Sequence, residues 1–316
     1  RGWAKAHPGG ERWIWFFDGR DATDAFYALH SYGPNGSSKA ADRLAKLPKC
    51  DAPPEKEYKA PSPSEYAASM NFRELRGKLE TDGFFKRNVF KEAWAFIQVV
   101  GLYAAGQFFA YSNPWLATLL LGLGMVQAGW LGHDYVHGRG PLCDALRYMP
   151  TLLNGHSVEW WSQKHSMHHT FTNEEHLDND VMMEPFFFLR PPSESGRPDN
   201  ALRKYQHIYG YPLLSIMFWL WRFHSVEGAW KRKDKKELVL LGVNYLWLAT
   251  CMPWQVAIGS VFFSGFIVAS LVSATHQSEE IMEYGEGAEY VEGQFRSTRD
   301  ADTVFGPLET WIWGGM

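Results

Sequence analysis

The sequence predicts a mainly α-helical fold that spans a membrane and follows a more polar front segment. From Ala93 onward the chain contains long apolar runs that carry almost no charge, whereas residues 1–92 are rich in charged residues, glycine and proline. The 15 Trp, 14 Tyr and 21 Phe form an aromatic excess that suits a membrane interface. Two groups of histidines also recur at helical spacing in the apolar part, so helices are expected to carry them.

Composition narrows the class of protein. The formal net charge of -4 at pH 7 gives no sign of a nucleic-acid partner. Cys50, Cys143 and Cys251 form no CxxC pair, so neither a disulfide framework nor a thiolate zinc site is indicated. The chain begins at Arg1 rather than at a methionine, so the lack of a visible secretory signal excludes nothing.

The polar part is expected to end in a linker. Residues 53–56 and 61–64 combine prolines with charged or small polar residues, which cannot supply a buried face. Residues 51–87 are therefore predicted to connect two domains. Within them we expect a short helix at residues 72–80, ending at Asp82-Gly83.

Two transmembrane helical hairpins are predicted in the apolar part. Residues 93–111 and 115–131 are nearly free of charge and are separated by Asn113-Pro114, which suits a turn. Residues 238–251 and 255–275 repeat this arrangement, although the first of them is short and needs its flanks to span the hydrocarbon. Core helices of a large soluble protein remain the alternative, because runs below about 20 residues are not decisive.

The hairpins predict on which side of the membrane each segment lies. Each hairpin returns the chain to the side that it left, so the front segment, both histidine groups and His276 share one face. The apolar run at residues 207–223 would break this arrangement if it spanned, so we expect an interfacial or protein-packed helix there. The basic run at residues 231–236 marks the shared face as cytosolic by the positive-inside rule, unless it is merely a solvated loop.

The histidine groups predict a metal site. His133 and His137 lie four residues apart, and His165, His168 and His169 hold positions i, i+3 and i+4, so each group shares one helix face. Imidazole binds zinc, copper, nickel and iron, so residue type alone does not choose the metal. Five or six convergent histidines are enough for two metals, however, and a pair of irons supplies redox chemistry that side chains lack. The pattern therefore favours oxidation of a lipid by dioxygen.

At this point the chain resembles a known family. The segments HDYVHG, QKHSMHHTFTN and THQSEEIM, followed by residues 292–316, are similar to the membrane fatty-acid desaturases, specifically the front-end desaturases with a fused cytochrome b5 domain. The resemblance covers nearly the whole chain. It implies that a di-iron centre, of two iron ions, is held by His133, His137, His165, His168, His169 and His276.

Other residues near these boxes have two interpretations each. Asp134, Asp178 and Asp180 match acidic positions of the family, where they would orient imidazoles through the second ring nitrogen; helix capping or salt bridging is the alternative. We expect His156 to pack or to form hydrogen bonds rather than to bind metal, and His176 to be solvated. Trp160 and Trp161 are expected near the second box, or else as interfacial anchors.

The front segment resembles the heme-binding half of cytochrome b5. His7-Pro8-Gly9-Gly10 is followed by residues 21–26 and then by His30. The resemblance implies that His7 and His30 are the axial ligands of heme b, with glycines that let the backbone approach the flat macrocycle. The expected domains are a partial cytochrome b5-like heme domain at residues 1–50, the linker at 51–87 and the desaturase domain at 88–316.

The chain departs from the family pattern at its C-terminal end. The family's third box, QxxHH, would follow the segment Trp313-Gly314-Gly315, but the sequence stops at Met316. We therefore expect a chain truncated at both ends, because the earlier strands of the heme module are also missing. Such a fragment should be a poor or inactive catalyst and should bind fewer than two iron ions.

The resemblance implies a complete electron path. Cytochrome b5 reductase would reduce the heme, and the linker would raise the effective concentration of that electron donor at the iron site. Dioxygen would then serve to insert a cis double bond into a polyunsaturated acyl chain carried on coenzyme A or a phospholipid. The enzyme would lie in the endoplasmic reticulum membrane, with its active site facing the cytosol. Sphingolipid desaturases and lipid hydroxylases of the same fold, a metal-dependent lipid hydrolase and a non-enzymatic membrane heme electron carrier are the alternatives.

Overall fold

The predicted helical fold is confirmed by the structure, a computed structural model. It describes residues 3–7, 9–30, 39–48, 58–138, 140–195, 199–277, 279–284, 289–300 and 302–314. Within these ranges no strand forms, and Glu174 and Met282 make an isolated parallel bridge. The chain divides into two compact units: the first comprises residues 1–85 and 285–296, and the second comprises residues 86–284 and 297–316.

The first unit is built from short helices around one longer helix. Its elements are η1 (Ala4–Ala6), α1 (Arg12–Phe16), α2 (Thr23–Leu29), α3 (Lys39–Ala45) and α4 (Pro63–Thr81), together with most of α15 (Tyr290–Ser297). Arg73 on α4 donates to both carboxylate oxygens of Asp24 on α2, at 2.7 and 2.8 Å. This bidentate ion pair fixes α2 against α4, because two N–H groups of the guanidinium match the two carboxylate oxygens.

The helix expected at residues 72–80 is longer than predicted. It is α4, which begins at Pro63, directly after a capping box in which Ser62 and Glu65 bond each other's backbone N–H groups. Pro63 holds the first helical position, where a missing N–H group costs nothing. The prolines that suggested a linker therefore belong in part to a helix start.

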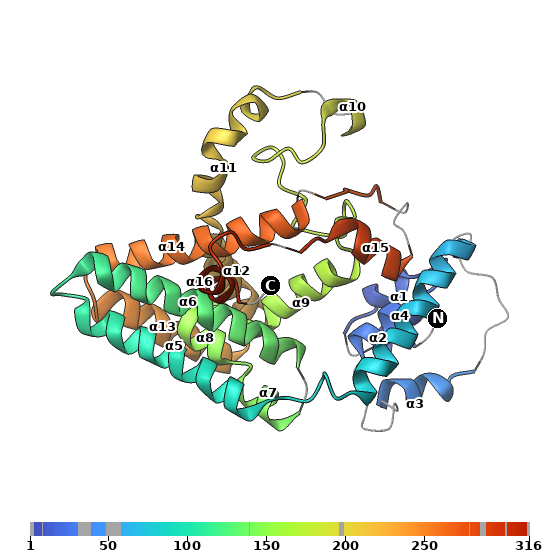
Figure 1. Cartoon of the computed structure of the whole chain (residues 1–316), viewed down its shortest axis with the longest axis horizontal. Coiled ribbons are helices and arrows are strands. Elements are labelled where there is room, and N and C mark those ends of the chain that lie inside the picture. The colour runs from blue at the N-terminus through green and yellow to red at the C-terminus, as the bar shows by residue number, and fades with distance from the viewer. Residues whose placement is uncertain are drawn as a thin grey trace. The chain divides into compact units, whose positions relative to one another are not determined.

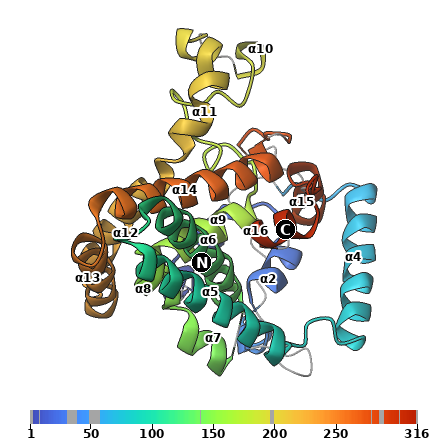
Figure 2. The same ribbon diagram turned by 60° about the vertical axis from the view of Figure 1, so that its left-hand side comes forward.

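The second unit contains both predicted hairpins. The first consists of α5 (Val89–Phe109) and α6 (Pro114–His137), and the second consists of α13 (Lys235–Thr250) and α14 (Trp254–Val272). Figures 1 and 2 show α14 running alongside α6. Close approach of these helices depends on small residues: a Cβ at Gly122 would lie 2.5 Å from the ring of Phe263. Buried aliphatic and Met side chains fill the space between the helices, including Leu121, Met125, Val256 and Val261.

Among the described residues of the second unit, two segments could cross a membrane, judged by length and composition alone. They are Pro114–His137, which is α6, and Trp254–Gln277, which joins α14 to η3 (Ser273–Gln277). At 16 residues α13 is about 24 Å long, shorter than a hydrocarbon core of about 30 Å, so it needs its flanks to span, as expected.

The apolar run at residues 207–223 is not one continuous helix. It is divided between α11 (Gln206–Leu214) and α12 (Met217–Arg232), and α11 extends away from α5, α6 and α13 in both views (Figures 1 and 2). The junction lies against α14, because a Cβ at Gly265 would be 2.6 Å from the carbonyl oxygen of Ser215. Protein packing of this segment agrees with the expectation, whereas its position in a membrane stays a prediction.

The remaining elements are short or carry the site. They are α7 (Pro141–Leu146), α8 (Met149–Asn154), α9 (Val158–Thr170), α10 (Pro192–Ser195), η2 (Ala201–Tyr205) and α16 (Pro307–Ile312). Of these, α9 carries the second histidine group.

Candidate metal centre

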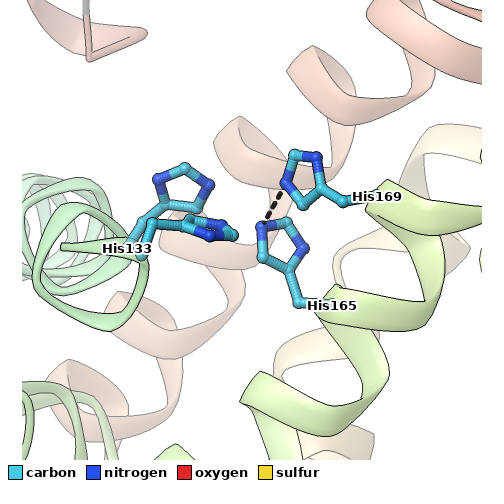
Figure 3. A group of neighbouring side chains, drawn as sticks. His133, His165 and His169 are labelled. Atoms are coloured by element: carbon cyan, nitrogen blue, oxygen red, sulfur yellow. Dashed lines mark hydrogen bonds between the residues drawn. The ribbon is translucent and has the colours of Figure 1, made fainter. Parts of the chain in front are cut away.

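Histidines from α6 and α9 meet in one cluster. The ring centres of His133 and His165 lie 4.9 Å apart, and those of His137 and His169 lie 4.8 Å apart. One ring nitrogen from each of these four residues lies within 4.8 Å of the others. In Figure 3, His133 points from α6 toward His165 and His169 on α9, whose Nε2 atoms are 2.9 Å apart. We call these four residues the four-histidine cluster.

His168 and His276 form a pair beside this cluster. Their ring centres lie 4.6 Å apart, and the ring of His168 lies 5.9 Å from that of His165. His276 comes from η3, which continues α14, so three segments that are distant in the sequence converge. All six histidines that were expected to bind metal are thus gathered in one region.

The second ring nitrogen of both paired histidines has an oxygen partner. Nδ1 of His168 lies 2.8 Å from Oδ2 of Asp178, and Nδ1 of His276 lies 3.3 Å from the carbonyl oxygen of Ser297. A proton on Nδ1 would be donated to these oxygens and leave Nε2 as the atom that can bind a metal. Of the two interpretations of Asp178, the contact with Nδ1 of His168 favours orientation of an imidazole.

The other two acidic residues near the boxes differ from Asp178. Asp180 forms an ion pair with Lys164, which is the salt-bridging alternative, and its Oδ2 lies 3.7 Å from Nδ1 of His168. The side chain of Asp134 is 68% exposed, and its oxygen lies 3.5 Å from Nδ1 of His133, at the limit of a hydrogen bond. Neither carboxylate orients an imidazole as closely as Asp178 does.

The surroundings of the α9 histidines shift their pKa values in opposite directions. Desolvation, assisted by the neighbouring imidazoles, lowers the pKa of His165 well below its usual range and that of His169 to about 2. Burial also acts against the charged form of His168, but the hydrogen bond and the charge of Asp178 outweigh it and raise the pKa of His168. Neutral imidazoles offer a lone pair to a metal, so the donor set of the cluster fits iron as well as zinc or copper.

Local structure explains why these side chains face one another. The hydroxyl oxygen of Ser157 caps α9 by accepting the N–H of Trp160 at 3.1 Å, which starts the helix that aligns His165 and His169. On α6, Gly132 lies so close to Pro150 of α8 that a Cβ would collide with the proline ring. Because Gly132 has no side chain, the turn of α6 that carries His133 can pack directly against Pro150 of α8.

Asn173 is a site residue that the sequence did not single out. Its backbone is left-handed, with φ of 60°, a conformation that asparagine adopts more readily than most residues. Its buried Nδ2 donates to the carbonyl oxygens of His276 at 2.8 Å and Glu280 at 3.1 Å. Asn173 therefore ties the segment after α9 to the segment that carries His276. Its position within the segment QKHSMHHTFTN was the available signal.

The remaining residues near the boxes behave largely as expected. Trp161 stacks on His165 with ring centres 4.1 Å apart, which places it beside the second box. His156 is buried and packs against Phe218, with ring centres 4.9 Å apart. His176 is exposed. The packing role expected for His156 and the solvation expected for His176 are therefore both found.

In the first unit the structure brings His7 and His30 together. Their ring centres lie 6.1 Å apart. Nδ1 of His7 lies 3.1 Å from the carbonyl oxygen of Gly10, and Nδ1 of His30 lies 2.8 Å from that of Phe26. A Cβ at Gly9 would lie 3.2 Å from the ring of His7, so glycine keeps space beside this imidazole.

Comparison with known proteins points to one family. A family model described as fatty acid desaturase matches residues 110–316. An acyl-lipid 8-desaturase of Rebecca salina is 26% identical, over 88% of this chain and 67% of its own length. A Delta(6)-fatty-acid desaturase of Caenorhabditis elegans is 27% identical, over 99% of this chain and 80% of its own. A Delta(8)-fatty-acid desaturase of Euglena gracilis is 27% identical, over 98% of this chain and 78% of its own. No solved structure matches the chain.

Proposed function

From the premise that this chain belongs to the fatty acid desaturase family, we propose that it catalyses front-end desaturation of a polyunsaturated fatty acyl chain. The resemblance of the histidine boxes to fatty acid desaturases is confirmed by the family model and the relatives, whereas the fused cytochrome b5 domain stays a prediction. The chain is therefore of an oxidoreductase type that acts in lipid metabolism. The proposal adds the reaction: two hydrogens are removed from the acyl chain and a cis double bond is left. Relatives named as Delta(6) and Delta(8) desaturases support the front-end class.

The convergence of histidines from α6, α9 and η3 carries this proposal. We assign the metal ligands to the six side chains of His133, His137, His165, His168, His169 and His276. A pair of iron ions held there would supply the redox chemistry for activating dioxygen, which no side chain can supply. The protein residues orient these ligands: Asp178 holds His168 through Nδ1, and Trp161 stacks on His165.

We further propose that His7 and His30 hold heme b. The ring centres of His7 and His30 lie 6.1 Å apart, a separation at which both imidazoles would reach one metal through bonds of about 2 Å. Carbonyl partners at both Nδ1 atoms leave Nε2 of each ring toward the metal. Residues 1–50 would then be a cytochrome b5-like electron donor, joined through residues 51–87 to the desaturase domain at 88–316 and reduced by cytochrome b5 reductase.

Membrane attachment follows from the family and agrees with the two candidate spans. We propose an endoplasmic reticulum location with the iron site facing the cytosol. The basic run at residues 231–236 supports this orientation through the positive-inside rule. The acyl substrate, on coenzyme A or a phospholipid, would reach the site from the bilayer.

Product analysis tests the reaction. The gene is expressed in a host that makes no polyunsaturated fatty acids, and a panel of such acids is fed. The positions of new double bonds are then identified by mass spectrometry. We expect a new cis bond on the carboxyl side of an existing one. Hydroxylated products, or desaturated sphingoid bases with unchanged fatty acids, would contradict the proposal.

Iron analysis tests the site. His165→Ala should abolish the new product and lower the iron bound per purified chain. The matched control is His176→Ala, because His176 is an exposed histidine in the loop that follows the same helix. Equal iron content in the two variants would refute the assignment of the ligands.

A further inference from the structure

A buried carboxylate from another helix lies at the start of the histidine helix α9. Glu237, in the first turn of α13, has no exposed surface. Its Oε1 accepts the backbone N–H of Glu159 at 3.0 Å, and its Oε2 accepts the hydroxyl of Ser157 at 2.6 Å. Both of these partners belong to the N-terminal end of α9.

Arg232 completes this arrangement. Its Nη2 donates to Oε2 of Glu237 at 2.7 Å and to the hydroxyl oxygen of Ser157 at 3.0 Å. Ser157 therefore donates its one hydroxyl proton to Glu237 and accepts from Arg232 and from the N–H of Trp160. A serine hydroxyl has one donor and two lone pairs, so its hydrogen-bonding capacity is fully used. We call Ser157, Arg232 and Glu237 the α9 anchor.

The anchor suits the electrostatics of a helix start. The first N–H groups of a helix lack partners within the helix and form its positive end. Glu237 satisfies one of these groups with a negative charge, and Ser157 satisfies another. Because a buried carboxylate needs a paired cation, Arg232 is the group that allows Glu237 to be placed there. Arg232 also belongs to the basic run that was expected either to mark the cytosolic face or to form a solvated loop.

The position of the anchor gives it control over the metal ligands. His165 lies seven residues after Val158, about 10 Å along the helix axis. Rotation of α9 by about 10° would move an imidazole nitrogen, roughly 6 Å from the axis, by about 1 Å. Functional constellations must be held within about 0.5 Å. Asp178 fixes the other end of α9 through His168, so the helix is held at both ends.

We propose that Glu237 is a positioning residue, which together with Arg232 sets the rotation and axial position of α9 and hence the geometry in which His165 and His169 bind iron. This inference rests on the proposed function of the four-histidine cluster. Glu237 itself touches neither metal nor substrate. Its effect is transmitted through the hydrogen bonds to the first turn of α9.

The test compares two carboxylates that differ in contact with α9. In Glu237→Gln the side-chain shape is kept, but the amide nitrogen must face one of the donors Ser157, Glu159 or Arg232. The matched control is Glu227→Gln: Glu227 on α12 forms an exposed pair with Lys231 and belongs to no part of the anchor. Iron affinity is measured by chelator competition on the purified full chain, and the bound iron is examined by Mössbauer spectroscopy.

We expect Glu237→Gln to lower iron affinity by roughly 10- to 100-fold, as loss of a partner that orients ligands does, and to change the Mössbauer parameters. Glu227→Gln should match the unmodified protein in both. A purely stabilising role would lower the melting temperature and leave the spectrum of bound iron unchanged. An unchanged affinity and spectrum in folded Glu237→Gln would overturn the inference.

A milder variant covers the case in which Glu237→Gln does not fold. Ser157→Ala leaves the pair of Glu237 and Arg232 intact, together with the bond from the N–H of Glu159 to Glu237. It removes the hydroxyl, which is one of the two links from the pair to α9 and also accepts the N–H of Trp160. It should lower iron affinity in the same direction and by a smaller factor; no loss of affinity in folded Ser157→Ala would also overturn the inference. The proposed function and this inference fail in different ways. The proposed function fails if His165→Ala removes no iron from the unmodified chain. The inference alone fails if His165→Ala removes the iron but the variants of the α9 anchor leave iron binding unchanged.

Discussion

Nδ1 of His168 lies 2.8 Å from Oδ2 of Asp178, and both side chains are almost completely withdrawn from solvent. The same carboxylate accepts the backbone N–H groups of Asn173 and Asp180, each at 2.9 Å. Three donors therefore fix Asp178, and Asp178 in turn fixes the ring of His168. An imidazole held in this way presents Nε2 in one direction, which is what a metal ligand requires.

Asp178→Asn should weaken metal binding. All three contacts of Asp178 require an acceptor, so the amide nitrogen of asparagine would face a donor and the ring of His168 would lose its fixed direction. We expect iron affinity to fall by roughly 10- to 100-fold, measured by chelator competition. Asp199→Asn is the control, because Asp199 pairs with Arg203 at the surface. Similar affinities for the two variants would show that Asp178 does not orient the ligand.

The same pair predicts how the stability of the iron-free protein depends on pH. Asp178 raises the pKa of His168 above 6.5, so its stabilising effect is complete below pH 6.5 and is lost as pH rises through the raised value. The lowered pKa values of His165 and His169 act in the opposite direction, so the pair is tested by comparing two chelator-treated proteins at each pH. Asp178→Asn should lower the melting temperature, relative to the unmodified protein, by more at pH 6.5 than at pH 8.5. The same lowering at both pH values would show that the pair does not cause this pH dependence.

Asn173→Ala should destabilise the second unit without touching a metal ligand. It removes the amide that bonds the carbonyl oxygens of His276 and Glu280, and it places alanine in a left-handed conformation. Loss of a buried donor costs about 1–3 kcal/mol. Asn173→Gly separates the two effects, because glycine also lacks the amide but adopts a positive φ without strain. Melting temperatures in detergent should fall in both variants and further in Asn173→Ala.

Gly132→Ala tests the close approach of α6 to α8. The added methyl group would collide with the ring of Pro150, so α6 must shift at the turn that carries His133. Overpacking of this kind costs about 1–3 kcal/mol. Gly101→Ala on α5 is the matched control, since no atom beyond the neighbouring backbone of its own helix lies within 4 Å of its added Cβ, and alanine favours a helix there. In thermal unfolding, Gly132→Ala should melt at a lower temperature than Gly101→Ala. Equal melting temperatures would contradict the packing argument.

Helical spacing and turn residues were the parts that the sequence could predict. An i, i+3, i+4 pattern must share a helix face, so the convergence of His165 with His169 follows from local geometry. Asn113 at the tip of the first hairpin and Pro253 at the tip of the second are local signals as well, and both cap or precede a helix in the structure. The start of α4 had an equally local signal in Ser62 and Glu65, which the neighbouring prolines obscured.

Contacts between distant segments could not be predicted in the same way. No local pattern states that Asn173 bonds the carbonyl of His276, because that bond joins residues that are 103 positions apart. Arg232 shows the same difficulty, since its charge suggests a solvated run while its partner, Glu237, lies buried at the start of α9. The residues that hold the site in place therefore emerge only when the helices are packed.

His30→Ala tests whether the first unit holds heme independently of the histidines in the second unit. Removing one of two opposed imidazoles should abolish the six-coordinate, bis-histidine absorption spectrum of heme. Iron bound at the four-histidine cluster should stay unchanged, because the side chains proposed to bind it come from α6 and α9. Thr23→Ala is the control, since Thr23 bonds Asp21 near the surface of the same unit. We expect it to keep the heme spectrum. A full bis-histidine spectrum in His30→Ala would show that His30 is not an axial ligand, whereas a joint loss of heme and cluster iron would show that the two sites do not bind independently.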